Sequence, residues 1–164
     1  MLFRSSGTDV FLRGVVFGNG MFVAVGDQTI LTSEDGIRWV RRELTTEFNP
    51  QWFDVAYGRG RFVVLGNDGG YSRIATSANG VDWEFSPLRI HQAGLYGVAY
   101  GHGNFVAVGE NRSSIGSTLV LSSTDGRNWT RHSAGTRRRL FQVAFGNSRF
   151  VASGEGGTIL ESGI

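Results

Sequence analysis

Arginine supplies most of the side chains in this sequence that could bind a ligand. All 16 basic residues are Arg. Three of them are consecutive, Arg137, Arg138 and Arg139, and guanidinium groups of this kind can bind a phosphate or an acidic partner, although adjacent arginines in a loop are more often solvated. The basic residues are nearly balanced by 14 acidic ones, which leaves a net charge of +2. We therefore predict no nucleic-acid partner, because such proteins usually carry a strongly basic surface.

Residues that could hold a metal or a cofactor are few and scattered. The sequence has no Cys, which removes thiolate ligands, disulfides and a cysteine nucleophile. The three histidines, His91, His102 and His132, lie far apart in the sequence and have no carboxylate at a spacing typical of metal sites. No glycine-rich loop precedes a helix pattern, so the sequence indicates no phosphate-binding loop. We expect no metal and no cofactor.

Four internal repeats must position whatever chemistry these residues perform. The repeats begin "RGVVFGNGMFVAVG", "FDVAYGRGRFVVLG", "YGVAYGHGNFVAVG" and "FQVAFGNSRFVASG", and they start 40, 43 and 45 residues apart. Each continues through a loop into "TILTS", "RIATS", "LVLSS" or "TILES". A period of this length, with several short apolar segments per repeat, is typical of a β-propeller blade.

The segments within each repeat predict strands and leave no room for helices. They are four to six residues long, rich in Val, Phe, Tyr and Ile, and separated by Gly. We predict an all-β fold: a β-propeller of four four-stranded blades, forming a single domain over residues 1–164. Eight aromatic residues at repeated positions are expected to be buried between blades: Phe17, Phe22, Tyr57, Phe62, Tyr100, Phe105, Phe145 and Phe150.

A seven-residue phrase follows the third strand of the first three repeats. It is spelled "SEDGIRW", "SANGVDW" and "STDGRNW". Asx-Gly favours a tight turn in which the Asx side chain accepts bonds from backbone N–H groups and Gly takes a positive φ. The Trp that follows can act as a wedge between blades. We predict structural roles for twelve residues of these phrases: Ser33, Asp35, Gly36, Trp39, Ser77, Asn79, Gly80, Trp83, Ser123, Asp125, Gly126 and Trp129.

This order of residues resembles the Asp-box, or bacterial neuraminidase repeat. The wider repeat is similar to propeller repeats of bacterial surface proteins and of photosystem II assembly factors, and the resemblance covers essentially the whole chain. The family includes sialidases, which use three arginines, a Tyr-Glu pair, an acidic Asp and an Arg-Ile-Pro motif. This sequence has no Arg-Ile-Pro, only four blades where those enzymes have six, and no Tyr and Glu at matching repeat positions. We therefore expect no enzymatic activity.

The fourth copy of the phrase is missing because the two chain ends meet in its place. The last repeat ends at "TILESGI", whereas residues 1–6 align with the outer strand that begins at Trp129. We expect residues 1–6 to complete the blade formed by residues 140–162, which removes a free sheet edge. This pairing is the same whether it is made within one chain or between two.

The loops divide into a uniform face and a variable face. The turns between the first two strands of each repeat and the seven-residue phrases are uniform and form one face. The loops between the second and third strands and the connections between repeats vary and form the other face. Variable loops on a rigid scaffold usually carry function. Ten loop residues are therefore candidates for a binding face: Asp68, Tyr71, Arg73, Arg89, His91, Glu110, Arg112, Arg137, Arg138 and Arg139.

Two functions fit these features. The first is a non-catalytic propeller that acts as a scaffold or binds a protein. Such a propeller could also be a fragment or an engineered protein whose purpose is assembly. The alternative is a lectin-like module, although the loops do not repeat as one glycan site per blade requires. A four-bladed monomer and an eight-bladed ring of two chains are both open, and we favour the homodimer because repeats like these normally occur in larger rings.

The sequence predicts no membrane contact. No apolar run approaches the ~20 residues of a membrane span, and the N-terminus lacks the apolar stretch of a secretory signal. The cellular compartment is not indicated.

Overall fold

The chain folds almost entirely into β-strands. The computed structural model describes residues 7–44, 49–112 and 117–163. Within these ranges the only helical segment is a single 3-10 turn, η1 (Glu155–Gly157). No helix of the described part has the length and apolar character needed to cross a membrane.

Four antiparallel sheets follow one another along the chain, which confirms the predicted blades. Blade 1 contains β1 (Leu12–Gly18), β2 (Met21–Gly26), β3 (Thr29–Ser33) and β4 (Val40–Arg42). Blade 2 contains β5 (Gln51–Gly58), β6 (Arg61–Asp68), β7 (Tyr71–Ser77) and β8 (Glu84–Phe85). Blade 3 contains β9 (Ala93–Gly101), β10 (Asn104–Asn111), β11 (Ser117–Ser123) and β12 (Thr130–His132). Blade 4 contains β13 (Leu140–Gly146), β14 (Arg149–Gly154) and β15 (Ile159–Glu161). Its predicted fourth strand, residues 1–6, lies outside the described residues.

The turn between the first two strands of each blade accounts for part of the sequence repetition. Two consecutive residues have positive φ there, for example Asn19 and Gly20 at 49° and 73°, and His102 and Gly103 at 46° and 76°. Hairpins of this twist require positive φ at both central residues, and Asn and Gly adopt it at the lowest cost. His102 therefore occupies a turn position.

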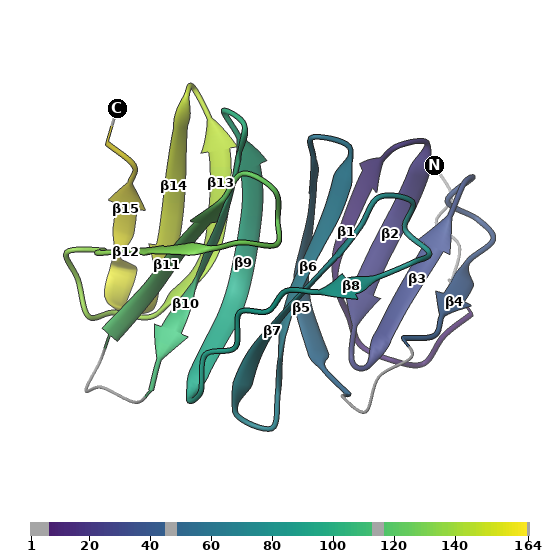
Figure 1. The fold of residues 1–164 in the computed structure, drawn as a ribbon, viewed down its shortest axis with the longest axis horizontal. Coiled ribbons are helices and arrows are strands. Elements are labelled where there is room, and N and C mark those ends of the chain that lie inside the picture. The colour runs from purple at the N-terminus through teal and green to yellow at the C-terminus, as the bar shows by residue number, and fades with distance from the viewer. Residues whose placement is uncertain (1–6, 45–48, 113–116, 164) are drawn as a thin grey trace.

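The blades stand side by side in a row (Figure 1). The first strand of each blade packs against the first strand of the next, so β1 contacts β5, β5 contacts β9 and β9 contacts β13. Blade 1 and blade 4 lie at opposite ends of the row (Figure 1). The described residues thus form an open row of four blades.

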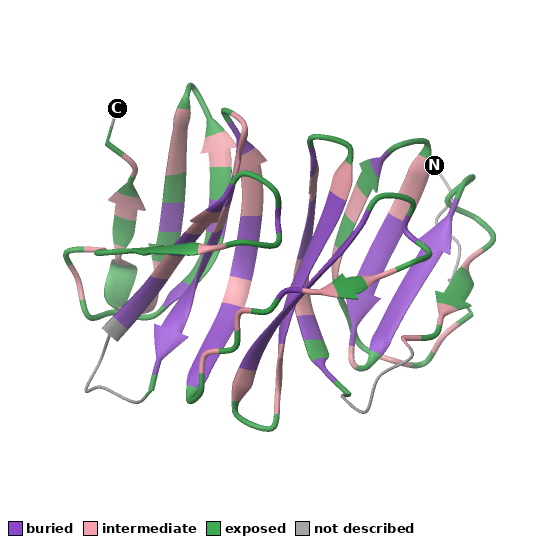
Figure 2. Ribbon diagram, in the orientation of Figure 1, coloured by how far each residue is buried: buried purple, intermediate pink, exposed green. Residues whose placement is uncertain are grey.

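The hydrophobic core lies between blades. One cluster joins blades 1 and 2 around Trp52 and Phe62, and a second joins blades 2 and 3 around Leu65 and Phe105. A smaller cluster joins blades 3 and 4 around Leu140. Buried residues are accordingly frequent in blades 1 to 3 and sparse in blade 4 (Figure 2).

The repeated aromatic residues are buried with one exception. Phe62 and Phe105 are fully buried, and five others are half-buried. The prediction is wrong for Phe17, whose side chain is 56% exposed. Its counterparts Tyr57, Tyr100 and Phe145 pack on the preceding blade, and no blade precedes blade 1 among the described residues. The repeat pattern identifies the packing position of Phe17, but its burial depends on contact with a neighbouring blade.

Candidate functional site

The three seven-residue phrases form turns that we call the Trp hairpins, residues 33–39, 77–83 and 123–129. In the third, the Ser123 hydroxyl donates to Asp125 Oδ1 at 2.9 Å and accepts from the Gly126 N–H at 2.8 Å. Asp125 Oδ1 accepts from the N–H groups of Arg127 and Asn128, both at 2.8 Å. The same bonds recur around Asp35 and Asn79. Each hairpin is thus held by its own polar side chains.

Each of the second and third Trp hairpins rests on the blade before it. The Trp83 and Trp129 indole N–H groups donate back to the carbonyls of Gly80 and Gly126, at 3.1 and 3.0 Å. The two rings pack against the clusters between blades. A β-carbon at Gly126 would lie only 2.6 Å from Val63 of blade 2. Glycine therefore allows the hairpin to approach the neighbouring blade.

The Asp side chains of the hairpins are expected to make stability acid-sensitive. Backbone N–H donors, that of Asn128 foremost, hold the pKa of Asp125 well below its ordinary value, and Arg38 and Ile37 do the same for Asp35. A lowered folded-state pKa stabilises the fold above the unfolded pKa, near 3.9, and this contribution is lost as pH falls below it. Asn79 occupies the same position without a titratable group.

We therefore expect Asp125→Ala to lower the free energy of unfolding by about 1 kcal/mol at pH 7, as loss of a capping acceptor does. Asp35→Asn with Asp125→Asn, which copies Asn79, should keep most of the stability at pH 7 and lose less of it between pH 5 and pH 3 than the wild type does. Urea unfolding across this pH range measures both effects. An unchanged unfolding free energy for Asp125→Ala would contradict the structural role.

Five of the ten candidate binding residues meet at the end of blade 2. The rings of Tyr71 and His91 lie 4.8 Å apart, and the Arg89 guanidinium lies 5.3 Å from the Tyr71 ring centroid. Arg73 pairs with Asp68 at 3.2 Å, and only 4% of the Arg73 side chain is exposed. Arg73 therefore holds the loop together, whereas Tyr71 is half-buried and His91 is exposed.

A second group lies where blades 3 and 4 meet. Glu110 accepts a hydrogen bond from the Tyr96 hydroxyl at 2.5 Å and one from Arg112 Nε at 2.6 Å. Arg139 Nε lies 3.4 Å from Glu110 Oε2 and 3.5 Å from Glu155 Oε2. The structure thus brings together Glu110, Arg112 and Arg139 from the predicted set, and it adds Tyr96 and Glu155.

The sequence contained a signal for Tyr96. Tyr96 and Glu110 occupy the same repeat positions as Arg13 and Asp27, which form an ion pair at 2.7 Å in blade 1. The comparison of these two repeat positions between blades 1 and 3 therefore indicates that Tyr96 and Glu110 lie together. The two positions lie on neighbouring strands β9 and β10.

Tyr96, Glu110 and Arg112 form a network of hydrogen bonds. Burial and the hydrogen bond to Glu110 raise the pKa of Tyr96, so its hydroxyl stays protonated. Burial opposes ionisation of Glu110, but the hydrogen bonds from Tyr96 and Arg112 outweigh it and lower the pKa of Glu110. The Tyr96 oxygen also accepts from Arg112 at 3.0 Å. A neutral tyrosine hydroxyl that takes part in two hydrogen bonds is a poor nucleophile.

The remaining candidates lie beside this group. Arg137 is exposed, and the Arg138 guanidinium lies next to Gly156. The three consecutive arginines therefore do not converge on one point. No group of three or more His, Cys, Asp or Glu side chains suited to a metal occurs in the described ranges.

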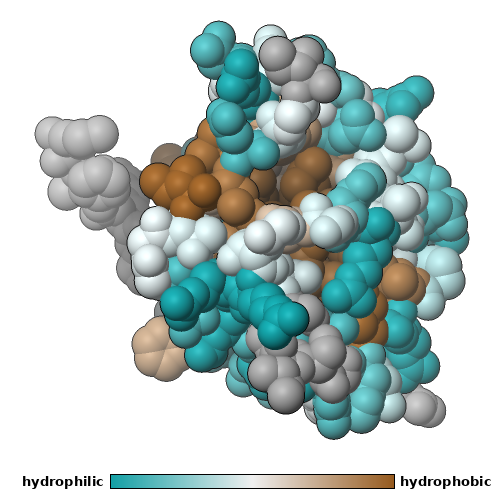
Figure 3. All heavy atoms as spheres, turned by 90° about the vertical axis from the view of Figure 1, so that its left-hand side faces the viewer, coloured by the Kyte–Doolittle hydropathy of each residue, from teal (hydrophilic) through white to brown (hydrophobic). Residues whose placement is uncertain are grey.

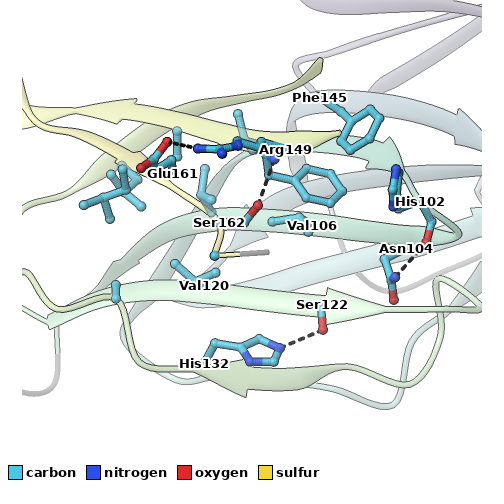
Figure 4. A pocket seen from close by; sticks show the side chains of 18 of the residues that line it. His102, Asn104, Val106, Val120, Ser122, His132, Phe145, Arg149, Glu161 and Ser162 are labelled. Atoms are coloured by element: carbon cyan, nitrogen blue, oxygen red, sulfur yellow. Dashed lines mark hydrogen bonds and ion pairs between the residues drawn. The ribbon is translucent and has the colours of Figure 1, made fainter. Parts of the chain in front are cut away.

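A cleft of about 860 Å³ separates blades 3 and 4. Its position corresponds to the seat of a Trp hairpin, because the hairpin of blade 3 covers Val63, Ile74 and Thr76 of blade 2, all at most 1% exposed. The residues of blade 3 at the same repeat positions line the cleft and are only half-buried: Val106, Val120 and Ser122. Figure 4 shows Val106, Val120 and Ser122 around this space, with the Ser122 hydroxyl 2.7 Å from His132 Nε2.

The two end faces of the row expose apolar residues. Val15 of blade 1 is 63% exposed, although its counterparts Val55, Val98 and Val143 are at most 8% exposed. Ile159 of blade 4 is 72% exposed, whereas its counterparts Ile30 and Ile74 are 1% exposed and its counterpart Val120, which lines the cleft, is half-buried. Figure 3 looks onto the blade 4 end and shows hydrophobic side chains exposed in its middle. Val151 and Phe141 are also exposed at this end.

Comparison with solved structures identifies the fold as that of β-propellers. The chain superposes on the computationally designed Ika4 protein with a TM-score of 0.68, 13% identity and coverage of 99% of both chains. It matches the designed Ika8 protein with a TM-score of 0.63 and 11% identity over 92% of this chain and 45% of Ika8. It matches virginiamycin B lyase from Staphylococcus aureus with a TM-score of 0.67 and 14% identity over 95% of this chain and 56% of the lyase.

The chain thus spans about half the length of Ika8 and of the lyase, but nearly all of Ika4. No protein-family model and no curated protein matches the sequence. The likeness to solved structures establishes the propeller fold of this chain.

Proposed function

We propose that the chain is a non-catalytic propeller scaffold that works as a closed eight-bladed ring of two copies. The observation that carries this proposal is the pair of exposed end faces. The position of Val15 is buried in the three following blades, at Val55, Val98 and Val143, and exposed only in blade 1 among the described residues. The position of Ile159 is buried in blades 1 and 2, half-buried at Val120 beside the cleft, and most exposed in blade 4. A second copy placed head to tail would cover both faces, and a two-fold axis would close the ring.

The cleft between blades 3 and 4 supports the same arrangement. It lies where blade 4 lacks a Trp hairpin and an outer strand among the described residues. Residues 1–6 align with an outer strand and precede blade 1, which in a head-to-tail ring stands beside blade 4 of the other copy. We propose that residues 1–6 of each copy complete blade 4 of the other. The coverage of less than half of Ika8 agrees with a half-propeller.

The variable loops form the binding face of this scaffold. The Tyr71–His91–Arg89 group and the exposed arginines Arg112 and Arg139 offer aromatic and cationic contacts suited to an acidic protein segment. We assign the Trp hairpins to the Asp-box type, with a structural role, because their Asp and Asn side chains are saturated by backbone donors. We propose no catalytic role for Tyr96 and Glu110, because the Tyr96 hydroxyl donates to Glu110 and accepts a hydrogen bond from Arg112.

Light scattering on the purified chain, coupled to size exclusion, tests the ring. We expect a species of twice 17.9 kDa that persists on dilution into the low micromolar range. A species of 17.9 kDa at all concentrations would overturn the proposal.

A further inference from the structure

A row of aromatic rings and glycines joins successive blades. The glycine that ends the first strand of each blade lies directly under an aromatic ring of the next blade: Gly18 under Tyr57, Gly58 under Tyr100 and Gly101 under Phe145. Any side chain at these glycines would overlap the ring. The ring therefore acts as a knob, and the glycine backbone is the socket that receives it.

One socket and one knob are left over, at opposite ends of the chain. Gly146 is the fourth glycine of the series, and no described atom lies within 4 Å of the β-carbon position above it. Phe17 is the first ring of the series, and its side chain is 56% exposed. Each of the three junctions within the chain uses one knob and one socket, so the unused pair is what a fourth junction requires.

The free knob already has the orientation of the seated ones. The Phe17 ring lies 4.6 Å from the Phe22 ring at an interplanar angle of 53°. The corresponding pairs with seated rings measure 4.7 Å and 50° for Tyr57 and Phe62, and 4.9 Å and 56° for Phe145 and Phe150. Assembly would therefore require little rearrangement of Phe17.

A second series of side chains gives the same order of blades. The Arg13 guanidinium lies 5.1 Å from the Phe53 ring centroid, Phe53 lies 5.4 Å from Tyr96, and Tyr96 lies 5.9 Å from Phe141. The series ends at Phe141, which is 43% exposed. The repeat places Arg13 of a following chain next to this ring, where a cation–π contact would repeat that of Arg13 with Phe53.

We infer that the junction between copies is a knob-and-socket contact in which Phe17 of one copy seats on Gly146 of the other. The inference rests on the proposed ring and specifies its junction. It makes the contact head to tail, so that a ring of two copies contains it twice, and it excludes a dimer in which two blade 1 faces meet each other. The contact continues the packing found at the three junctions within the chain.

Gly146→Val tests the socket. No described atom crowds this position and its φ is not positive, so the variant should fold with an unchanged circular dichroism spectrum. In the assembly the valine would collide with Phe17, and we expect the concentration at which the dimer dissociates to rise at least tenfold. Phe17→Ala should act in the same direction by removing the knob.

Cysteine cross-linking tests the contact directly, because the chain has no cysteine of its own. At the junctions within the chain, the β-carbon position of the glycine lies against Cγ of the ring, one bond from its β-carbon, so the two β-carbon positions are closer than the separation of about 3.5–4.5 Å typical of a disulfide. Two cysteines at these positions are therefore within reach of each other, and a small separation of the strands lets them cross-link. We expect Phe17→Cys mixed with Gly146→Cys to form a covalent two-chain species on oxidation, and each variant alone to form none. Val40→Cys mixed with Gly146→Cys is the matched control and should not cross-link.

The outcomes separate this inference from the proposed ring. A wild-type chain that stays at 17.9 kDa would overturn both. A wild-type dimer that neither weakens with Gly146→Val nor cross-links through positions 17 and 146 would overturn the knob-and-socket junction alone. A strong cross-link by Phe17→Cys with itself would also overturn it, because two blade 1 faces would then meet.

Discussion

Replacing Ile159 by arginine is expected to leave the chain folded and to abolish its assembly. Ile159 is 72% exposed in the single chain, so a charged side chain there stays in water and changes the stability of the fold little. In the proposed ring it would occupy the position at which Ile30 and Ile74 are 1% exposed and Val120 is half-buried. An unpaired guanidinium buried at each of the two junctions costs several kcal/mol. Light scattering should show the variant at 17.9 kDa.

Val40→Arg provides the matched control for this experiment. Val40 is an apolar residue with 50% exposure, but its counterparts Glu84 and Thr130 are exposed within the chain as well. The repeat therefore predicts that Val40 stays exposed in the ring, and its arginine variant should assemble like the wild type. Equal masses for the Ile159→Arg and wild-type proteins would show that the blade 4 end face is not an interface.

Deletion of residues 1–6 is expected to have the second large effect. In the proposed ring these residues would supply the outer strand that blade 4 lacks among the described residues, and without them the cleft of about 860 Å³ would stay open. An unpaired β15 edge and the half-buried Val106 and Val120 would then remain exposed. We expect loss of the dimer, aggregation or higher oligomers, and a lower melting temperature, because open sheet edges pair with other chains.

A rearranged chain controls for the deletion. Moving residues 1–6 to the C-terminus behind a short turn places the same strand in the same chain as blade 4. This variant should recover the melting temperature, because the cleft is then filled from within. A truncated chain with unchanged mass and melting temperature would contradict the role of residues 1–6 in closing blade 4.

The sequence predicted the blades because each blade folds from its own repeat. Strand lengths, the positive φ of Asn19 and Gly20, and the turn at Asp125 depend on neighbours within about forty residues, and the four repeats show the same pattern independently. The prediction failed for Phe17 because its burial depends on a blade that the chain does not contain. Burial between blades depends on whether a neighbouring blade is present, and the sequence of a single repeat does not contain this information.

The contacts among the candidate binding residues were predicted only in part, for a related reason. Tyr71 and His91 were predicted as loop residues, but Tyr71 begins β7. The contact between the two rings depends on how the chain after β8 returns to β7, where the two residues pair. Arg73 looked like a ligand contact, yet it is buried beside Asp68. The variable loops differ in sequence from one repeat to the next, so the repeats do not help to predict their contacts. The sequence therefore indicates where these loops lie better than which residues they contact.

A three-dimensional reconstruction of the assembled particle, by crystallography or electron cryomicroscopy, tests the central claim most directly. The account predicts a closed ring of eight blades with a two-fold axis, in which Phe17 of each copy lies on Gly146 of the other. A ring closed by four blades of one chain, or two half-propellers joined through any surface other than their blade 1 and blade 4 faces, would contradict it.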